Sequence, residues 1–145
     1  MGEGVPWTKA LSSPPSLTLH AHTCTFIYQY AGDSLVSCPQ PPDGTKREMD
    51  FLDSTFFKTP AQRLPMPAQV SALSTDICTM PQLKPITFRN PNIFVKFGHY
   101  VTVEEAQCLW MVQRAFQGTV PVPELFGWRV DNEGFIFICM QLIEG

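Results

Sequence analysis

The stretch IFVKFG, residues 93–98, is rich in β-branched and aromatic residues and predicts a β-strand with one charge at its centre. Because side chains alternate along a strand, Lys96 shares one face with Phe94 and Gly98, and the opposite face is wholly apolar. A lysine on such an element is costly unless its amine reaches solvent or meets an anion. Lys96 therefore belongs either to an edge strand or to a ligand-binding surface, and the strand pattern alone favours neither.

A helix is expected after this strand. Thr102 and Glu105 have the spacing of a capping box, in which the hydroxyl and the carboxylate satisfy free N–H groups of the first turn. Apolar residues recur at helical spacing as far as Phe116, and Gly118 is expected to end the helix. In the simplest interpretation, Glu105 caps the helix and has no other role.

Two further strands are expected at 125–130 and 135–142, because the intervening DNEG at 131–134 has the usual composition of a hairpin turn. VPVP at 120–123 predicts an extended connector. A short strand is expected at 86–88, between two prolines. The order of strand, helix, strand and strand predicts an α+β fold, with a small antiparallel sheet and one packed helix.

The chain before this domain is harder to interpret. Residues 48–85 predict a helical arm and a loop, with Pro67 suited to the first position of a short helix. Residues 1–47 contain Pro, Ser and Thr with few charges and predict a weakly ordered leader. His20, His22 and Cys24 form an HxHxC cluster there, but three ligands at strand spacing have no evident fourth. We interpret it as a chance cluster and predict no metal site.

Composition excludes some classes of function. The 145 residues are 44% hydrophobic, which is enough for a core, and the formal net charge of −3 without a basic run argues against a nucleic-acid partner. The sequence lacks an apolar run long enough to cross a membrane and an export signal at its start. Five widely and irregularly spaced cysteines are typical of reduced thiols. We therefore expect a cytoplasmic protein without a membrane partner.

Four short sequence blocks follow one another along the chain: VKFG at 95–98, EAQCLW at 105–110, VPVPELFGW at 120–128 and MQLIEG at 140–145. Together they resemble the N-terminal lobe (N-lobe) of the protein-kinase-like fold in the aminoglycoside phosphotransferase family, especially in its fungal members. The resemblance covers residues 86–145, and the arm around 56–70 also resembles its fungal counterpart. It implies that 86–145 form a truncated N-lobe.

The resemblance assigns roles to the strand lysine and the helix glutamate. Lys96 is expected to hold the α- and β-phosphates of ATP, oriented by Glu105. Glu104 is the alternative partner, and Glu105 is preferred because it directly precedes Ala106, as in the family pattern. A bound triphosphate needs a fixed cation, and a carboxylate keeps the flexible lysine stem aimed into the cleft.

The last block implies an adenine site. Gln141 is expected to offer its main-chain carbonyl and Ile143 its N–H, while Met140 lines the back of the pocket. Main-chain groups suit this task because the adenine edge needs one acceptor and one donor at a fixed separation. The alternative for Met140 is an ordinary core methionine.

Other family features are missing from the sequence. Residues 74–92 contain no glycine, and no His-Gly-Asp motif is present, so the chain offers neither a catalytic aspartate nor magnesium ligands. We expect a fragment of an ATP-dependent aminoglycoside phosphotransferase or choline kinase-like enzyme, whose small-molecule substrate is unknown. The 145-residue polypeptide is predicted to be inactive unless a second lobe is present. The alternatives are a non-catalytic module that binds nucleotide or a partner, and an unstable gene remnant.

Overall fold

The computed structural model describes residues 39–74, 84–116 and 118–144, which belong to one compact unit spanning 33–145. The strands are β1 (Glu48–Asp50), β2 (Ile86–Arg89), β3 (Asn92–Gly98), β4 (Leu125–Val130) and β5 (Ile136–Gln141). The helices are a 3₁₀ turn (Phe56–Lys58), α2 (Pro67–Leu73) and α3 (Val103–Phe116).

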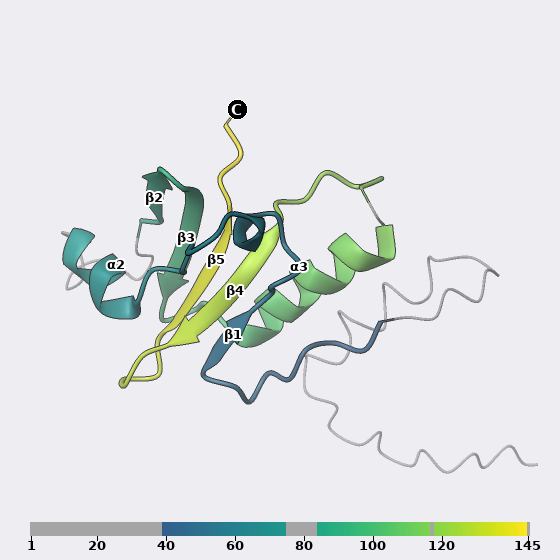
Figure 1. Cartoon of the computed structure of the whole chain (residues 1–145). Coiled ribbons are helices and arrows are strands. Elements are labelled where there is room, and N and C mark those ends of the chain that lie inside the picture. The colour runs from purple at the N-terminus through teal and green to yellow at the C-terminus, as the bar shows by residue number, and fades with distance from the viewer. Residues whose placement is uncertain (1–38, 75–83, 117, 145) are drawn as a thin grey trace, which may run out of the picture. The chain divides into compact units, whose positions relative to one another are not determined.

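The strands form one antiparallel sheet in the order β1-β4-β5-β3-β2. Figure 1 shows α3 beside one side of this sheet and α2 beside the other. The described residues therefore form a small α+β domain with a five-stranded antiparallel sheet and two α-helices, which confirms the predicted fold class at this level.

The sheet buries a different cluster on each face. The α3 face, as we name it, joins Val103 and Ala106 of α3 to Trp128, Ile138 and Met140 of the sheet. The opposite face is covered by residues 56–73, which we call the arm. This arm face contains, among others, Phe56, Leu64, Val70, Ile93, Val95, Phe97, Phe126, Phe137 and Cys139. The alternation predicted for 93–98 is confirmed, because Ile93, Val95 and Phe97 lie together on the arm face.

A one-residue irregularity in β4 makes this arrangement possible. Leu125 pairs with Met140, whereas Gly127 pairs with Cys139, so Phe126 is one extra residue on β4 between neighbouring partners on β5. Such a bulge resets the alternation of side chains. Leu125 and Trp128 consequently both join the α3 face, although they are three residues apart.

Gly127 is also a point of close approach between β4 and β1. A Cβ atom added here would lie 2.0 Å from the carbonyl oxygen of Met49, and the residue has φ +157°. No side chain fits at that separation. The absence of a side chain at Gly127 therefore allows β1 to pair with β4.

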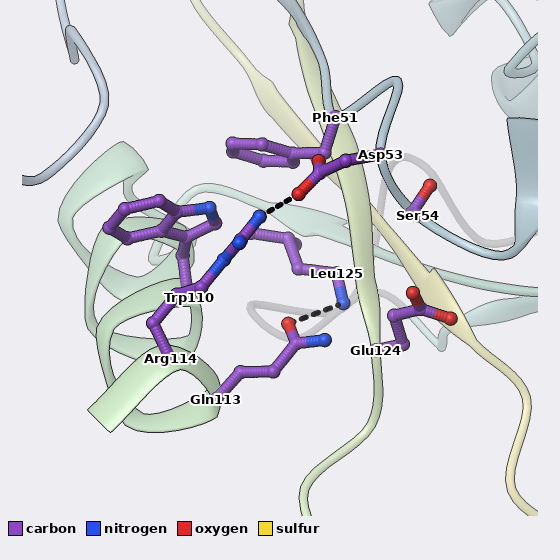
Figure 2. Close-up of a pocket in the computed structure, with 8 residues that line it drawn as sticks. All are labelled: Phe51, Asp53, Ser54, Trp110, Gln113, Arg114, Glu124 and Leu125. Atoms are coloured by element: carbon purple, nitrogen blue, oxygen red, sulfur yellow. Dashed lines mark hydrogen bonds and ion pairs between the residues drawn. The ribbon is translucent and has the colours of Figure 1, made fainter. Parts of the chain in front are cut away.

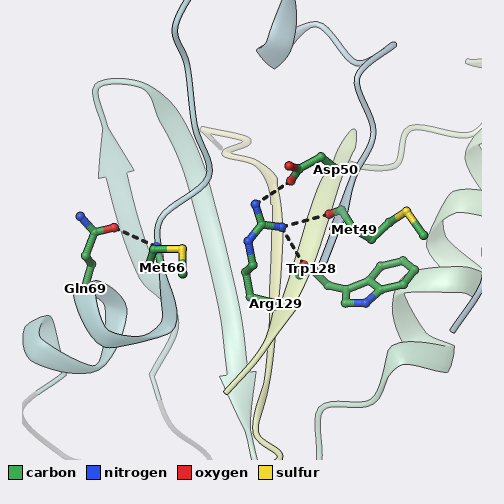
Figure 3. Close-up of polar contacts among 6 residues, drawn as sticks. All are labelled: Met49, Asp50, Met66, Gln69, Trp128 and Arg129. Carbon is green, nitrogen blue, oxygen red and sulfur yellow. Dashed lines mark hydrogen bonds and ion pairs between the residues drawn. The ribbon is translucent and has the colours of Figure 1, made fainter. Parts of the chain in front are cut away.

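A buried arginine fixes β1 in place (Figure 3). Arg129 of β4 is only 6% exposed. Its Nη2 donates to Asp50 Oδ1 at 2.7 Å, and its Nη1 donates to the carbonyls of Trp128 at 2.9 Å and Met49 at 3.3 Å. A buried guanidinium requires such partners, so the charge of Arg129 ties the short β1 to its neighbour.

The predicted arm needs a correction at its start. Residues 48–50 form a strand of the sheet rather than part of a helical arm. The end of the predicted leader also packs on the domain: the Trp128 indole donates to the Lys46 carbonyl at 2.9 Å, and the Gln107 amide donates to the Pro42 carbonyl at 2.7 Å. Tertiary partners far along the chain create both features, and local composition does not reveal them.

Other local predictions are confirmed. Pro67 opens α2, and Thr102 caps α3, because the Glu105 N–H approaches the Thr102 hydroxyl at 3.4 Å. The turn at 131–134 is closed by the Asp131 carboxylate, which accepts from the N–H groups of residues 133 and 135. The HxHxC cluster at 20–24 lies outside the described residues.

Candidate functional site

The ammonium of Lys96 forms an ion pair with Glu105 Oε1. Lys96 lies in the middle of β3, paired with Ile138 of β5, and Glu105 lies in the first turn of α3. Glu104 is exposed on the same turn, so the geometry selects Glu105 from the two candidate carboxylates. Of the predicted capping box, the structure has the bond from the Glu105 N–H to the Thr102 hydroxyl, whereas the Glu105 carboxylate contacts Lys96.

The sequence explains why the two side chains meet. The apolar alternation of β3 buries Val95 and Phe97 under the arm, which leaves Lys96 on the side of α3. The Thr102 cap fixes where α3 begins and therefore where Glu105 lies along it. Val103 and Ala106, on either side of the acidic pair, are buried against the sheet and set the rotation of the helix.

A pocket of about 400 Å³ lies beside this ion pair, between the sheet and α3. Lys96 and Glu105 are its charged lining residues, and its walls are otherwise mostly apolar. The apolar lining includes Phe94, Leu109, Val112, Ile138 and Met140. The volume is within the usual range for small-molecule sites, and an apolar wall with a few convergent polar groups is their usual chemistry.

The lysine and glutamate side chains remain 45% and 41% exposed. An ion pair this accessible is screened by solvent and holds its partners weakly, so the ammonium is free to exchange the carboxylate for another anion or to bind both. Chemically, the pair offers a positioned cation at the edge of an apolar pocket.

The three residues of the predicted adenine site are placed differently. Met140 is buried in β5 and lines the same pocket as Lys96. Gln141 ends β5 and is exposed; its N–H donates to the Glu124 carbonyl at 2.8 Å. Ile143 is 59% exposed, and its N–H has no partner within the described residues. Gln141 and Ile143 are not part of the pocket lining, so the structure brings together only Lys96, Glu105 and Met140.

A second pocket, of about 320 Å³, was not predicted from the sequence. Figure 2 shows it between the side chains of Trp110, Gln113 and Arg114 on α3 and those of Ser54 and Glu124 across from them. The spacing of Trp110 and Arg114, four residues apart on one helix, is its only local signal. The remaining lining residues come from segments distant in the sequence.

The described residues contain neither a metal-binding cluster nor a membrane-spanning helix. Among residues 39–74, 84–116 and 118–144, no group of three or more His, Cys, Asp or Glu side chains is arranged to hold a metal ion. In the same ranges, no helix is both long and apolar enough to cross a membrane.

Comparison with family models, with curated proteins and with solved structures finds no match for this chain. The assignment of a function therefore depends on the chemistry of the two pockets and on the sequence blocks described above.

Proposed function

We propose that this domain binds ATP in the pocket beside Lys96, as the nucleotide-binding half of a kinase of the aminoglycoside phosphotransferase or choline kinase type. The observation that carries the proposal is the ion pair between Lys96 and Glu105 at the edge of a pocket lined by Met140. A triphosphate requires a fixed cation, and the resemblance expects this pairing at these positions.

The rest of the proposed site follows from the end of β5. Ile143 is exposed, and its N–H has no hydrogen-bond partner among the described residues. It therefore offers the donor that an adenine edge needs. Gln141 is proposed to supply the acceptor through its main-chain carbonyl. Phosphoryl transfer is proposed only for a protein in which a second lobe supplies a catalytic base and magnesium ligands.

Thermal shift and calorimetric titration with ATP test the phosphate contact. A ligand selective for the folded state raises the melting temperature, and we expect ATP to do so. Lys96→Met is expected to weaken ATP binding at least about tenfold while adenosine binding changes little, since adenosine has no phosphate. Lys84→Met removes an exposed lysine that does not line the pocket and is the matched control.

A pair of substitutions at one position tests the adenine contact. Ile143→Pro removes the N–H, whereas Ile143→Ala shortens the side chain and keeps the N–H. We expect the proline variant alone to lose both ATP and adenosine binding, with unchanged circular dichroism. Equal binding by both variants, or ATP binding that is insensitive to Lys96→Met, would contradict the proposed site.

A further inference from the structure

The second pocket shares no lining residue with the pocket of Lys96. It is formed by the C-terminal half of α3, the loop after β1 and the start of β4 (Figure 2). Its volume of about 320 Å³ suits a small molecule, and its lining is mainly polar.

Two buried polar atoms on residues that line this pocket lack a hydrogen-bond partner in the described part of the chain. They are Nε1 of Trp110 and Oγ of Ser54. Ser54 is 4% exposed, so solvent does not readily compensate its hydroxyl. Buried donors and acceptors are nearly always satisfied in folded proteins, and two on one pocket point to a bound group. The indole N–H is only a donor, so its partner must be an acceptor.

Each charged group of the pocket already has a partner. Arg114 lies over the Trp110 ring, 5.2 Å from its centroid, and forms an ion pair with Asp53. Glu124 accepts from the N–H of Thr55 at 2.9 Å and from its hydroxyl. The lining therefore carries two carboxylates and one guanidinium, and the excess negative charge disfavours a simple anion.

We propose that this pocket binds a small zwitterion with an ammonium and a carboxylate group, such as a free amino acid. The ligand carboxylate accepts from the Trp110 indole and from Arg114, whose exposed pairing with Asp53 is weak enough to be shared. The ligand ammonium lies between Asp53 and Glu124. A simple cation would leave the indole donor without a partner, because an ammonium has no acceptor.

Glycine, acetate and methylammonium test this inference, because each of the last two retains one of the two charged groups of glycine. The measurement is the indole N–H signal of Trp110 in proton–nitrogen correlation spectra, assigned by its loss in Trp110→Phe. We expect glycine to shift this signal saturably, and acetate and methylammonium to bind at least about tenfold more weakly. The Trp128 indole donates to the Lys46 carbonyl and reports that the fold is intact.

A conservative substitution separates charge from shape. Glu124→Gln keeps an oxygen that can accept from Thr55 but removes the negative charge, so we expect it to weaken glycine binding and not acetate binding. Glu133→Gln, at an exposed acid of the β4–β5 turn, is the matched control and should change neither.

The inference is overturned if glycine gives no saturable shift, as expected of a site that holds only water. It is also overturned if acetate binds as well as glycine, or if the two variants behave alike. Every titration is made without nucleotide, so its result is independent of the ATP proposal.

Discussion

The two faces of the sheet differ in what fills them. The arm face is closed by stacked aromatic rings, with Phe97 and Phe137 5.1 Å apart at 8° and Phe56 and Phe126 5.0 Å apart at 26°. The α3 face has an apolar centre, but it also has the Lys96–Glu105 ion pair and both of the pockets described above. The aromatic centre of the arm face therefore stabilises the domain, whereas the α3 face has a charged pair beside its pockets. A further pocket, of about 640 Å³, lies beside α2 and is lined by Met66, Ser71 and Arg129 among others.

Mutations on each face test this difference. Substitutions under the arm should change stability and leave ligand binding unchanged in the molecules that remain folded. Substitutions of the charged groups beside α3 should do the reverse. A change that affects both properties equally would remove the distinction between the faces.

The largest effect is expected from Phe137→Ala. Phe137 is 2% exposed and stacks on Phe97, so its removal leaves a cavity under the arm. We expect a loss of about 3–5 kcal/mol in the free energy of unfolding, measured by urea denaturation. Ligand affinity, measured below the unfolding transition, should not change. A loss below about 1 kcal/mol would show that the arm face is loosely packed.

A smaller loss is expected from Gly127→Ala. The new Cβ would lie 2.0 Å from the Met49 carbonyl oxygen, so β1 must move away from β4. We expect a cost of about 1–3 kcal/mol, measured in the same way. Gly134→Ala is the control, since Gly134 also has positive φ (+89°) but nothing within 4 Å of an added Cβ. Equal losses in both variants would assign the effect to backbone strain and not to crowding.

Cys139 provides a pH-dependent test of the arm face. Burial raises the pKa of the Cys139 thiol from 9.0 to about 12. Above pH 9 the unfolded chain loses this proton while the folded chain keeps it. The stability that this thiol contributes is therefore complete below pH 9 and is lost as the pH rises toward 12, by about 1.4 kcal/mol per unit.

The measurement is the free energy of unfolding of the wild type and of Cys139→Ala at about pH 7 and about pH 10. Because the variant lacks the thiol, we expect the difference in stability between the two proteins to shrink at the higher pH. A constant difference would mean that the thiol ionises as readily in the folded protein as in the unfolded chain.

The smallest effect on stability is expected at the Lys96–Glu105 pair. Both side chains are more than 40% exposed, so Lys96→Met and Glu105→Gln should each lower the free energy of unfolding by no more than about 1 kcal/mol. Each should nevertheless reduce the rise in melting temperature caused by ATP. A large loss of stability in either variant would make the pair a structural element of the α3 face.

Much of the fold was accessible from the sequence because its signals are local. The β3 alternation, the Thr102 cap and the hairpin turn at 131–134 each depend on residues within a few positions of one another. The ion pair was predicted differently, from the resemblance to the aminoglycoside phosphotransferase N-lobe, and the structure contains the pair between Lys96 and Glu105. Its assignment to ATP stays a prediction.

The features that could not be predicted from the sequence depend on residues far apart along the chain. β1 has only three residues, two of them acidic, and it is a strand through its pairing with β4, where Asp50 also meets Arg129, 79 positions away. The bulge in β4 is visible only through its pairing with β5. The second pocket likewise requires Asp53 to meet Arg114, 61 positions away. None of these leaves a periodic pattern.

The distance between β1 and β4 along the chain has a consequence for synthesis. Residues 48–50 emerge from the ribosome long before residues 127–129, with which they pair. During translation, which proceeds at about 5–20 residues per second, this edge of the sheet has no partner, and the segment that later covers Gly127 must wait for several seconds. The strand made first therefore stays unpaired until most of the domain has been synthesised, and a chaperone that binds the first half of the chain would act in that interval.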